Sequence, residues 1–439
     1  MQVKVTPRLT QGTINLPSSK SMAHRAILCA CLAKGTSVIS DVDFNKDVHA
    51  TIDCMKALGA SIEMNGNTLT IQGCDIKKLD HSALCPCNES GSTLRFIIPL
   101  ASLTNQKITF TGQGRLMNRP MHIYQELFDQ QNIPFVQDET ITIHGALQAQ
   151  TYEIDGNVSS QFISGLLLAA PLMDKETKII IKEPYESRSY VDLTLEMLKR
   201  FGIEVIEKGN TYTIAPNQNY QATNYSVESD YSQLAFFGVL ASLQNQLTLK
   251  GCNPHSKQGD KVILDILKEV GAIISISDTE IQVQSHPLQP MNVDLSNCPD
   301  LGPILCVLAS FIPGKNYIYN AARLRMKESD RIEAMETELK KWGVNIQSDQ
   351  DSITIYGKEN YSQDHIVEID AHNDHRIVMA MTIFGLCAQS DSLIHDSQAI
   401  EKSYPTFFED IKKIRGDVTI ESEGVSKIFG GEFGGLPDS

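Results

Sequence analysis

Positively charged residues stand at the predicted beginnings of helices in this sequence, where they could bind an anion. In "NLPSSKSMAHRAIL" (residues 15–28), Lys20 and Arg25 accompany serines that can cap the first turn of a helix. A helix N-terminus carries partial positive charge, so cations there are disfavoured unless an anion lies between them. We therefore interpret this segment as an anion-binding site.

The same combination recurs at other predicted helix starts. Capping residues precede apolar helical patterns in "ESGSTLRFIIPLASL", "NVSSQFISGLLLAA", "KESDRIEAMETELKKWG" and "DAHNDHRIVMAM", with Ser329 or Asp330 and then Asp374 as the N-caps of the last two. Capping explains these polar residues but not the accompanying cations, which are Arg95, Arg331, Arg376 and, in "NRPM", Arg119. We expect the helix starts to converge on phosphate or carboxylate groups of a substrate with several negative charges.

Two acidic residues stand among these cations. Asp300 in "NCPDLGPILCVLAS" and Glu328 in "KESDR" each precede an apolar helical pattern. Either carboxyl group could exchange protons at a bound anion. Helix capping is the alternative interpretation of both residues.

A repeat of about seventy residues supplies the elements that would position these side chains. Helix, glycine or asparagine, strand, turn and strand follow one another around positions 59, 132, 202, 271, 343 and 416, which are 73, 70, 69, 72 and 73 residues apart. The polar segment 215–229 is the candidate crossing between two halves. We expect two similar α/β domains of three copies each, although helix, glycine and strand successions are common in any large α/β protein.

The net charge and the cysteine content restrict which molecules the protein can bind and where it can function. The net charge of −15 argues against nucleic acid or an anionic membrane as a partner. The ten cysteines lie mostly in apolar segments, and the close pair Cys85 and Cys87 has no second pair at zinc spacing, so we expect free thiols, no metal and a reducing cytosol. The first residues lack a signal-peptide pattern and the apolar runs are short, so we expect a cytoplasmic protein without a membrane span.

The motifs resemble those of a known family. "LPSSKSMAHRAIL", "ESGSTLR", "NRPM", "VSSQF", "SRSYVDLTLEML", "PDLGPI", "RMKESDRI", "NDHR" and "EKSYPTF" occur in the order found in the 5-enolpyruvylshikimate-3-phosphate (EPSP) synthase family of enolpyruvyl transferases. The resemblance implies an α/β fold of two similar domains, each of three βαβαββ repeats with buried helices, an inside-out α/β barrel. It places domain one at residues 1–19 plus 229–439 and domain two at 20–228.

The resemblance also implies a reaction without metal or organic cofactor. The enolpyruvyl group of phosphoenolpyruvate is transferred to the 5-hydroxyl of shikimate 3-phosphate, with release of phosphate, in the shikimate pathway to chorismate and the aromatic amino acids. We expect these small molecules as partners, no nucleic acid or membrane, and a monomer. The family is the target of the inhibitor glyphosate, and the small Gly91 would leave room for it.

Site residues are carried over position by position. Those similar to the family's shikimate 3-phosphate contacts are Ser21, Arg25, Ser159, Ser160, Ser187, Tyr190, Asp300 and Lys327. Those similar to its phosphoenolpyruvate contacts are Lys20, Gly91, Arg119, Gln161, Arg331, Arg376 and Lys402. The resemblance implies that Asp300 takes the hydroxyl proton and that Glu328 or Lys20 protonates the methylene carbon.

Some residues depart from the family pattern. Ser18 replaces a usual glycine, Glu89 and Arg323 stand where asparagine is common, and Phe96 stands where proline is common. We leave Glu89 and Arg323 out of the predicted contacts for that reason.

Three alternative functions stay open at this point. A sister enzyme acts on UDP-N-acetylglucosamine, but it carries a cysteine in the loop corresponding to "TGQGRLMNRPM", and no cysteine lies between Cys87 and Cys252 here. A non-catalytic repeat protein that binds anions is the second alternative. A metal hydrolase is the third, with ligands in "DAHNDHR", namely Asp370, His372, Asp374 and His375.

Overall fold

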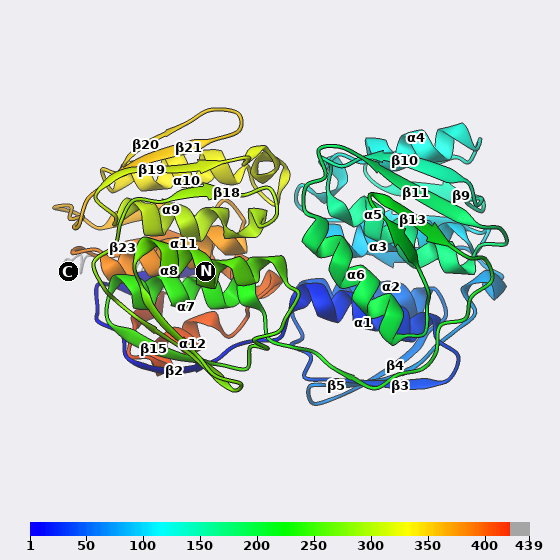
Figure 1. The fold of residues 1–439 in the computed structure, drawn as a ribbon, viewed down its shortest axis with the longest axis horizontal. Helices are drawn as coiled ribbons and strands as arrows, with labels where there is room; N and C mark the ends of the chain where they lie inside the picture. Colours follow the sequence, from blue (N-terminus) through cyan, green and yellow to red (C-terminus); the bar gives the residue numbers. More distant parts are fainter. Residues whose placement is uncertain (422–439) are drawn as a thin grey trace, which may run out of the picture.

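Two lobes lie side by side in the computed structural model, which describes residues 1–421 (Figure 1). Each lobe has its own cluster of buried hydrophobic side chains. The first cluster draws on residues 3–16 and 231–418, and the second on residues 22–227. Within the described residues, the chain therefore enters the second lobe once and returns once to the lobe where it began.

Each lobe carries three four-stranded sheets. In the first lobe the strands are β2 (Gly12–Asn15), β15 (Gln246–Lys250), β16 (Ile273–Ile276) and β17 (Glu280–Gln284); β18 (Asn292–Asp294), β19 (Gly314–Tyr319), β20 (Asn345–Ser348) and β21 (Ile353–Gly357); β1 (Gln2–Thr6), β22 (Val367–Asp370), β23 (Ser392–His395) and β24 (Asp417–Glu421). In the second lobe they are β3 (Thr36–Ser40), β4 (Ser61–Asn65), β5 (Thr68–Gln72) and β14 (Tyr225–Ser226); β6 (Ala83–Pro86), β7 (Lys107–Thr111), β8 (Phe135–Gln137) and β9 (Ile141–His144); β10 (Thr151–Asp155), β11 (Thr177–Lys182), β12 (Ile206–Lys208) and β13 (Thr211–Ile214).

All six sheets share one topology. The order β10-β11-β13-β12 has a parallel pair followed by two antiparallel pairs, and the other five sheets repeat it. In three sheets a strand comes from far along the chain. Strand β1 pairs with both β23 and β24, β2 pairs with β15, and β14 pairs with β3. The six predicted copies are therefore six βαβαββ units, three of which are completed by distant segments.

Each unit has an inner and an outer helix. The inner helices are α1 (Lys20–Leu32), α3 (Gly91–Ser102), α5 (Ser160–Ala169), α7 (Tyr231–Leu243), α9 (Gly302–Ser310) and α11 (His375–Cys387). The outer helices are α2 (Lys46–Ala57), α4 (His122–Gln130), α6 (Arg188–Arg200), α8 (Ile263–Val270), α10 (Arg331–Lys341) and α12 (Phe407–Lys413). The inner helices are buried almost all round, as their nearly unbroken apolar sequences require, whereas α8 buries only one face. The predicted fold class, with helices inside the sheets, is confirmed.

The spacing of the repeats has a backbone cause. The residues at 59, 132, 202, 271 and 343 all have positive φ, between 56° and 119°, which lets the chain turn from helix to strand. In the sixth copy the prediction is off by one residue, because Arg415 has the positive φ, of 68°. Gly416 is needed there for space instead, since an added Cβ would lie 2.4 Å from Ile411 Cγ2.

Two connections cross between the lobes next to each other. Ser18 and Ser229 form an isolated β-bridge, Ser19 N donates to Glu228 O at 2.7 Å, and Asp230 N donates to Pro17 O at 2.9 Å. Only the end of the polar segment 215–229 crosses, because its earlier residues add β14 to the second lobe. The domain boundaries 1–19 plus 229–439 and 20–228 stay a prediction, and residues 422–439 lie outside the described part.

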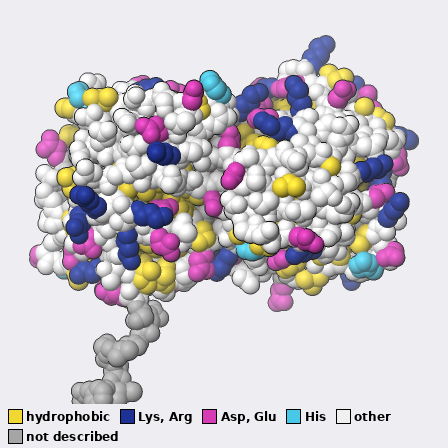
Figure 2. Space-filling view, turned by 90° about the horizontal axis from the view of Figure 1, so that it is seen from below, with side chains coloured by type: hydrophobic (Ala, Val, Ile, Leu, Met, Phe, Trp, Pro, Cys, Tyr) yellow, Lys and Arg dark blue, Asp and Glu magenta, His cyan; other side chains and the backbone are white. Residues whose placement is uncertain are grey.

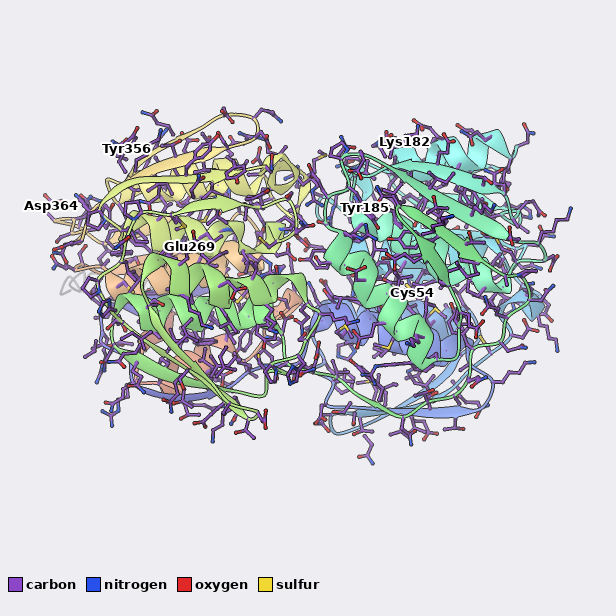
Figure 3. The ribbon with its side chains drawn as sticks, viewed as in Figure 1. Cys54, Lys182, Tyr185, Glu269, Tyr356 and Asp364 are labelled. Carbon is purple, nitrogen blue, oxygen red and sulfur yellow. The ribbon has the colours of Figure 1, made fainter. Side chains whose placement is uncertain are left out.

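The surface charges and the cysteines are arranged as the composition predicts. Figure 2 shows acidic and basic side chains scattered over both lobes on the face that it presents. All ten cysteines fall within residues 1–421 and are free thiols there, most of them buried, such as Cys54 inside the second lobe (Figure 3). Within that range, no helix is long and apolar enough to cross a membrane.

Candidate active site

A cavity between the lobes receives the N-terminal ends of all six inner helices. About 1420 Å³ of space not filled by protein atoms lies there, part of it open to solvent. Residues at or just before the starts of the inner helices line it, namely Lys20, Gly91, Ser160, Asp230, Asp300 and His375. Because every helix N-terminus carries partial positive charge, the fold itself directs six such ends at this space.

Caps are where the sequence predicts them. Asp330 accepts from Glu333 N at 3.0 Å and Asp374 from Arg376 N at 3.0 Å, while Ser19 and Ser90 cap α1 and α3. The capping interpretation of Asp300 is wrong, because its side chain caps neither the short 3-10 helix η5 (Pro299–Leu301) nor α9. Glu328 likewise contacts cations rather than a helix end.

Arg331 is the centre of an ion network on the first lobe. Its guanidinium lies 2.8 Å from Asp374 Oδ2, 2.8 Å from Glu328 Oε2 and 3.2 Å from Asp300 Oδ1. Lys327 Nζ lies 3.4 Å from the same oxygen of Asp300. Three carboxylates thus already occupy Arg331, so its predicted contact with phosphoenolpyruvate stays a prediction.

The two acids of this network are held ionised. Burial raises the pKa of Asp300, but the cations of Lys327, Arg376 and Arg331 outweigh it and hold that pKa well below its usual range. Burial also raises the pKa of Glu328, and Arg331 and then Arg119 outweigh it in the same way. Both groups therefore face the cavity as carboxylates when no substrate is bound.

Two other cationic side chains have N–H groups that make no hydrogen bond within the described part of the chain. Arg119 Nε and Arg376 Nη1 are buried and make no hydrogen bond to the described residues. Arg376 Nη2 donates to Ser232 Oγ at 3.0 Å, and Arg119 Nη1 lies 4.0 Å from Glu328 Oε1. Buried donors are normally satisfied, so these two guanidinium groups are poised for an anion that enters the cavity.

Lys20 carries a charge at the start of α1. Its Nζ lies 2.8 Å from Asp47 Oδ2. Burial lowers its pKa, but the negative charges of Asp47 and Glu328 outweigh burial, and the net pKa is raised. Lys20 is therefore an ammonium group on the cavity wall.

On the second lobe, two phenylalanine rings pack against arginines of the cavity wall. The guanidinium of Arg25 lies 4.9 Å from the ring centre of Phe96, and that of Arg95 lies 4.8 Å from the ring centre of Phe162. Burial lowers the pKa of Arg25 to about 10 and that of Arg95 to about 9, so both stay charged at neutral pH. Phe96, a departure from the family pattern, thus packs against a predicted shikimate 3-phosphate contact.

The structure brings all but one of the predicted site residues to the cavity wall. Those on the wall are Lys20, Ser21, Arg25, Gly91, Arg119, Ser159, Ser160, Gln161, Ser187, Tyr190, Asp300, Lys327, Glu328, Arg331 and Arg376. Lys402 is the exception. Its Nζ lies 2.7 Å from Glu89 Oε2 and also donates to the carbonyl of Asn373, so Glu89 draws it away from the wall. Its contact with phosphoenolpyruvate stays a prediction.

Several wall residues are not predicted from the sequence as substrate contacts. The sequence does not single out Asp47, Asp230, Ser232, Gln258 and Asp260. Of the other wall residues, Arg95 is predicted only as a cation at a helix start, Arg323 is left out of the predicted contacts, and His375 is named only for the metal-hydrolase alternative. Arg323 joins the lobes through Glu186, with Nε 3.0 Å from Oε2. Asp230 could have been found as the N-cap of α7, which accepts from Ser232 N at 2.8 Å.

The residues of the metal-hydrolase alternative have other partners. His372 Nε2 lies 2.7 Å from Glu338 Oε1, and Asp374 pairs with Arg331. Within residues 1–421, no group of three or more histidine, cysteine or acidic side chains could hold a metal ion. The structure therefore does not support the hydrolase interpretation.

Comparison with known proteins agrees with this geometry. The fold is that of the enolpyruvyl transferases: the structure of the enolpyruvyl transferase NikO from Streptomyces tendae has a TM-score of 0.75 at 14% identity, covering 95% of this chain and 98% of that one. An EPSP synthase from Acinetobacter baumannii has a TM-score of 0.77 at 26% identity, covering 95% and 100%.

The sequence comparisons give the family. The family model for EPSP synthase (3-phosphoshikimate 1-carboxyvinyltransferase) matches residues 5–411. The 3-phosphoshikimate 1-carboxyvinyltransferase of Clostridium perfringens is 40% identical over 422 residues, 94% of this chain and 98% of that protein. The enzyme of the same name from Clostridium kluyveri is also 40% identical, over 96% of this chain and 99% of that protein. The chain belongs to the EPSP synthase family.

Proposed function

We propose that the chain transfers the enolpyruvyl group of phosphoenolpyruvate to the 5-hydroxyl of shikimate 3-phosphate, giving 5-enolpyruvylshikimate 3-phosphate and inorganic phosphate. Membership of the family supports the reaction. The observation that carries the proposal is the convergence of six helix N-termini and of cations from both lobes on one cavity that also holds two ionised acids. Each substrate bears a phosphate and a carboxylate, which such a cavity would stabilise.

Chemistry in this cavity would need a base for the hydroxyl and an acid for the methylene carbon. The hydroxyl oxygen bonds to the central carbon of phosphoenolpyruvate, its proton passes to Asp300, and the methylene carbon gains a proton. Elimination then removes a proton from the new methyl group and expels phosphate, to which Asp300 returns a proton. Lys20 and Glu328 are the candidates for exchange at the methylene carbon, and of these Lys20 holds a proton before substrate binds.

Substrate binding would also make Asp300 a stronger base. Its pKa is low because Lys327, Arg376 and Arg331 face it. An anion that binds Lys327 or Arg376 brings negative charge close to Asp300 and offsets the stabilisation that these cations give to its carboxylate. The pKa of Asp300 then rises toward the range in which a carboxylate accepts protons effectively.

The decisive test is acceptor-dependent phosphate release. Release from phosphoenolpyruvate is measured with shikimate 3-phosphate, with no acceptor, and with UDP-N-acetylglucosamine. We expect release with the first acceptor alone. Release with the nucleotide sugar instead would assign the chain to the sister reaction, and binding of shikimate 3-phosphate without any release would favour a non-catalytic anion-binding protein.

A matched pair of variants tests whether the cavity is responsible. Arg376→Met should lower kcat/KM by about 100-fold or more, because a buried cation directed at the reacting charges is lost. Arg200→Met is the control, since Arg200 lies on the outer helix α6 with its side chain 51% exposed and paired with Glu196. The control should stay within about twofold of the parent.

We further propose that the chain acts as a monomer in the cytoplasm, on small molecules rather than nucleic acid or membrane. The free cysteines of the described residues support a reducing compartment. Size-exclusion chromatography with light scattering measures the oligomeric state, and a stable dimer at micromolar concentration would overturn that part.

A further inference from the structure

Tyr190 joins two acids of the first lobe from its position on the second. Its hydroxyl lies 3.2 Å from Asp260 Oδ2 and 3.3 Å from Asp300 Oδ2. Tyr190 stands in the first turn of α6, whereas Asp260 lies in the short 3-10 helix η4 (Gly259–Val262) that leads into α8. The contact therefore forms only where the lobes meet.

Asp260 differs from the other acids in and beside the cavity. Asp47, Asp300, Glu328 and Asp374 each have a cation within 3.2 Å, and Asp230 accepts hydrogen bonds through both oxygens at the start of α7. Asp260 has no ion-pair partner among the described residues. It is 6% exposed, it lines the cavity, and its Oδ1 makes no hydrogen bond there. A buried carboxylate without a cation is strongly disfavoured unless it binds or shares a proton.

The number of protons available limits how both hydrogen bonds of the Tyr190 hydroxyl can form at once. Its hydroxyl has one proton and can donate to only one of the two acids at a time. The second contact is satisfied when the other acid is itself protonated and donates to the tyrosine oxygen. Since Lys327 and Arg331 hold Asp300 ionised, the extra proton belongs on Asp260.

The charged and titratable groups around Asp260 come from several elements. They are Tyr190 of α6, Asp230 before α7, Cys298 before η5, Asp300 of η5 and Arg376 of α11. Burial and the charge of Asp300 raise the pKa of Asp260 to about 7, against the opposing effect of Arg376. Burial keeps the Cys298 thiol and the Tyr190 phenol neutral, because it raises the pKa of each. Asp260 can therefore both take up and release a proton near neutrality.

We propose that Asp260 is a positioning residue that stores the reaction proton of Asp300, with the Tyr190 hydroxyl as the relay between them. This inference rests on the proposed function. The transfer starts from the form in which Asp260 has released its proton and is a carboxylate. The substrate O–H bond breaks and its proton passes to the carboxylate of Asp300. That acid then donates to the oxygen of Tyr190, and the phenol's own proton passes to Asp260 Oδ2. Asp300 is again a carboxylate, and the reverse transfers return the proton for phosphate departure.

Replacement of Asp260 by asparagine removes the titration and keeps the shape. We expect kcat of Asp260→Asn in phosphate release to fall about tenfold to a hundredfold, with KM for shikimate 3-phosphate within about threefold. The wild-type kcat profile should show a limb near pH 7 that the variant lacks. Asp265→Asn, on the exposed face of α8, is the matched control and should keep both the rate and the limb.

A second variant tests the relay. Tyr190→Phe should abolish the same limb, and the double variant with Asp260→Asn should be no slower than the slower single variant, because both interrupt one path. An unchanged pH profile in Asp260→Asn, or a loss confined to KM, would overturn the proposal. Fully additive losses in the double variant would overturn it too.

An infrared titration of the ligand-free protein gives a readout without turnover. The wild type should show a carboxylic-acid carbonyl band that disappears as pH rises through about 7, and Asp260→Asn should lack it. If the variant does not fold, absence of such a band from the wild type still refutes the stored proton. If the wild type shows the band but releases no phosphate with any acceptor, the proposed function fails while the proton assignment stands.

Discussion

Gly91 lies against the guanidinium of Arg119, and this proximity makes Gly91→Ala a sharp test of the site. A Cβ at position 91 would lie 2.5 Å from Arg119 Nη1 and 2.8 Å from its Cζ. Ordinary contact begins near 3.4 Å, so the guanidinium must move by about 1 Å. Gly91 is the first residue of α3 and its φ is not positive, so alanine fits the backbone.

The size of the effect follows from what Arg119 does. Its side chain is 7% exposed and its Nε has no partner among the described residues, so we expect it to bind an anion of phosphoenolpyruvate. Loss of one charge-assisted hydrogen bond removes about 1.5–3 kcal/mol. At 1.4 kcal/mol for each factor of ten, KM for phosphoenolpyruvate should rise about tenfold to a hundredfold. KM for shikimate 3-phosphate should change by less than about twofold, because Arg119 is not among its predicted contacts.

Steady-state phosphate release at saturating shikimate 3-phosphate measures this shift. Gly238→Ala is the control, because it adds the same methyl group to a buried glycine of α7 whose nearest neighbour is Leu267 Cδ1 at 3.0 Å. Arg119→Lys should raise the same KM, and the double variant should show much less than the product of the two effects. Equal losses for both substrates, or multiplicative effects in the double variant, would refute the reasoning.

Three further outcomes are expected. Asp300→Asn should bind shikimate 3-phosphate within about threefold of the parent by calorimetry and lose about 100-fold or more in turnover, and unimpaired turnover would remove Asp300 from the reaction. Glyphosate should inhibit phosphate release, because Gly91 has no side chain that would displace the Arg119 guanidinium from its place in the cavity, and indifference to millimolar glyphosate would contradict this. The hydrogen bond to Glu338 raises the pKa of His372, so its stabilisation is full below about pH 6.5 and is lost as pH rises through the folded pKa. Urea unfolding of His372→Asn should therefore show a larger deficit near about pH 5.5 than near about pH 9, and an equal deficit at both would be inconsistent with the ion pair.

The repeats could be predicted from sequence because they depend on local backbone geometry. A chain that leaves a helix for a strand needs a left-handed residue there, which explains Gly59 and Gly202 and makes Asn132 an acceptable substitute. The convergence of cations was predictable for a related reason. Arginines that oppose the helix dipole at several starts need a common anion, and the cavity between the lobes receives the starts of all six inner helices.

Contacts between residues that lie far apart in the sequence could not be predicted. Lys402 looks like a free cation in sequence, but Glu89, more than three hundred residues earlier, holds it at 2.7 Å. Asp260 stands in "KQGDKV", where nothing local marks it. Its importance comes from Tyr190 of the other lobe and from Asp300, and the three meet only where the two lobes contact each other.

The central claim is that both phosphorylated substrates occupy the cavity between the lobes. A crystal structure of Asp300→Asn grown with phosphoenolpyruvate and shikimate 3-phosphate tests it directly, because the slow variant should trap both. We predict density for phosphoenolpyruvate against Lys20, Arg119 and Arg376, with the shikimate 5-oxygen facing position 300. Substrate density elsewhere on the lobes, with an empty cavity between them, would contradict the account.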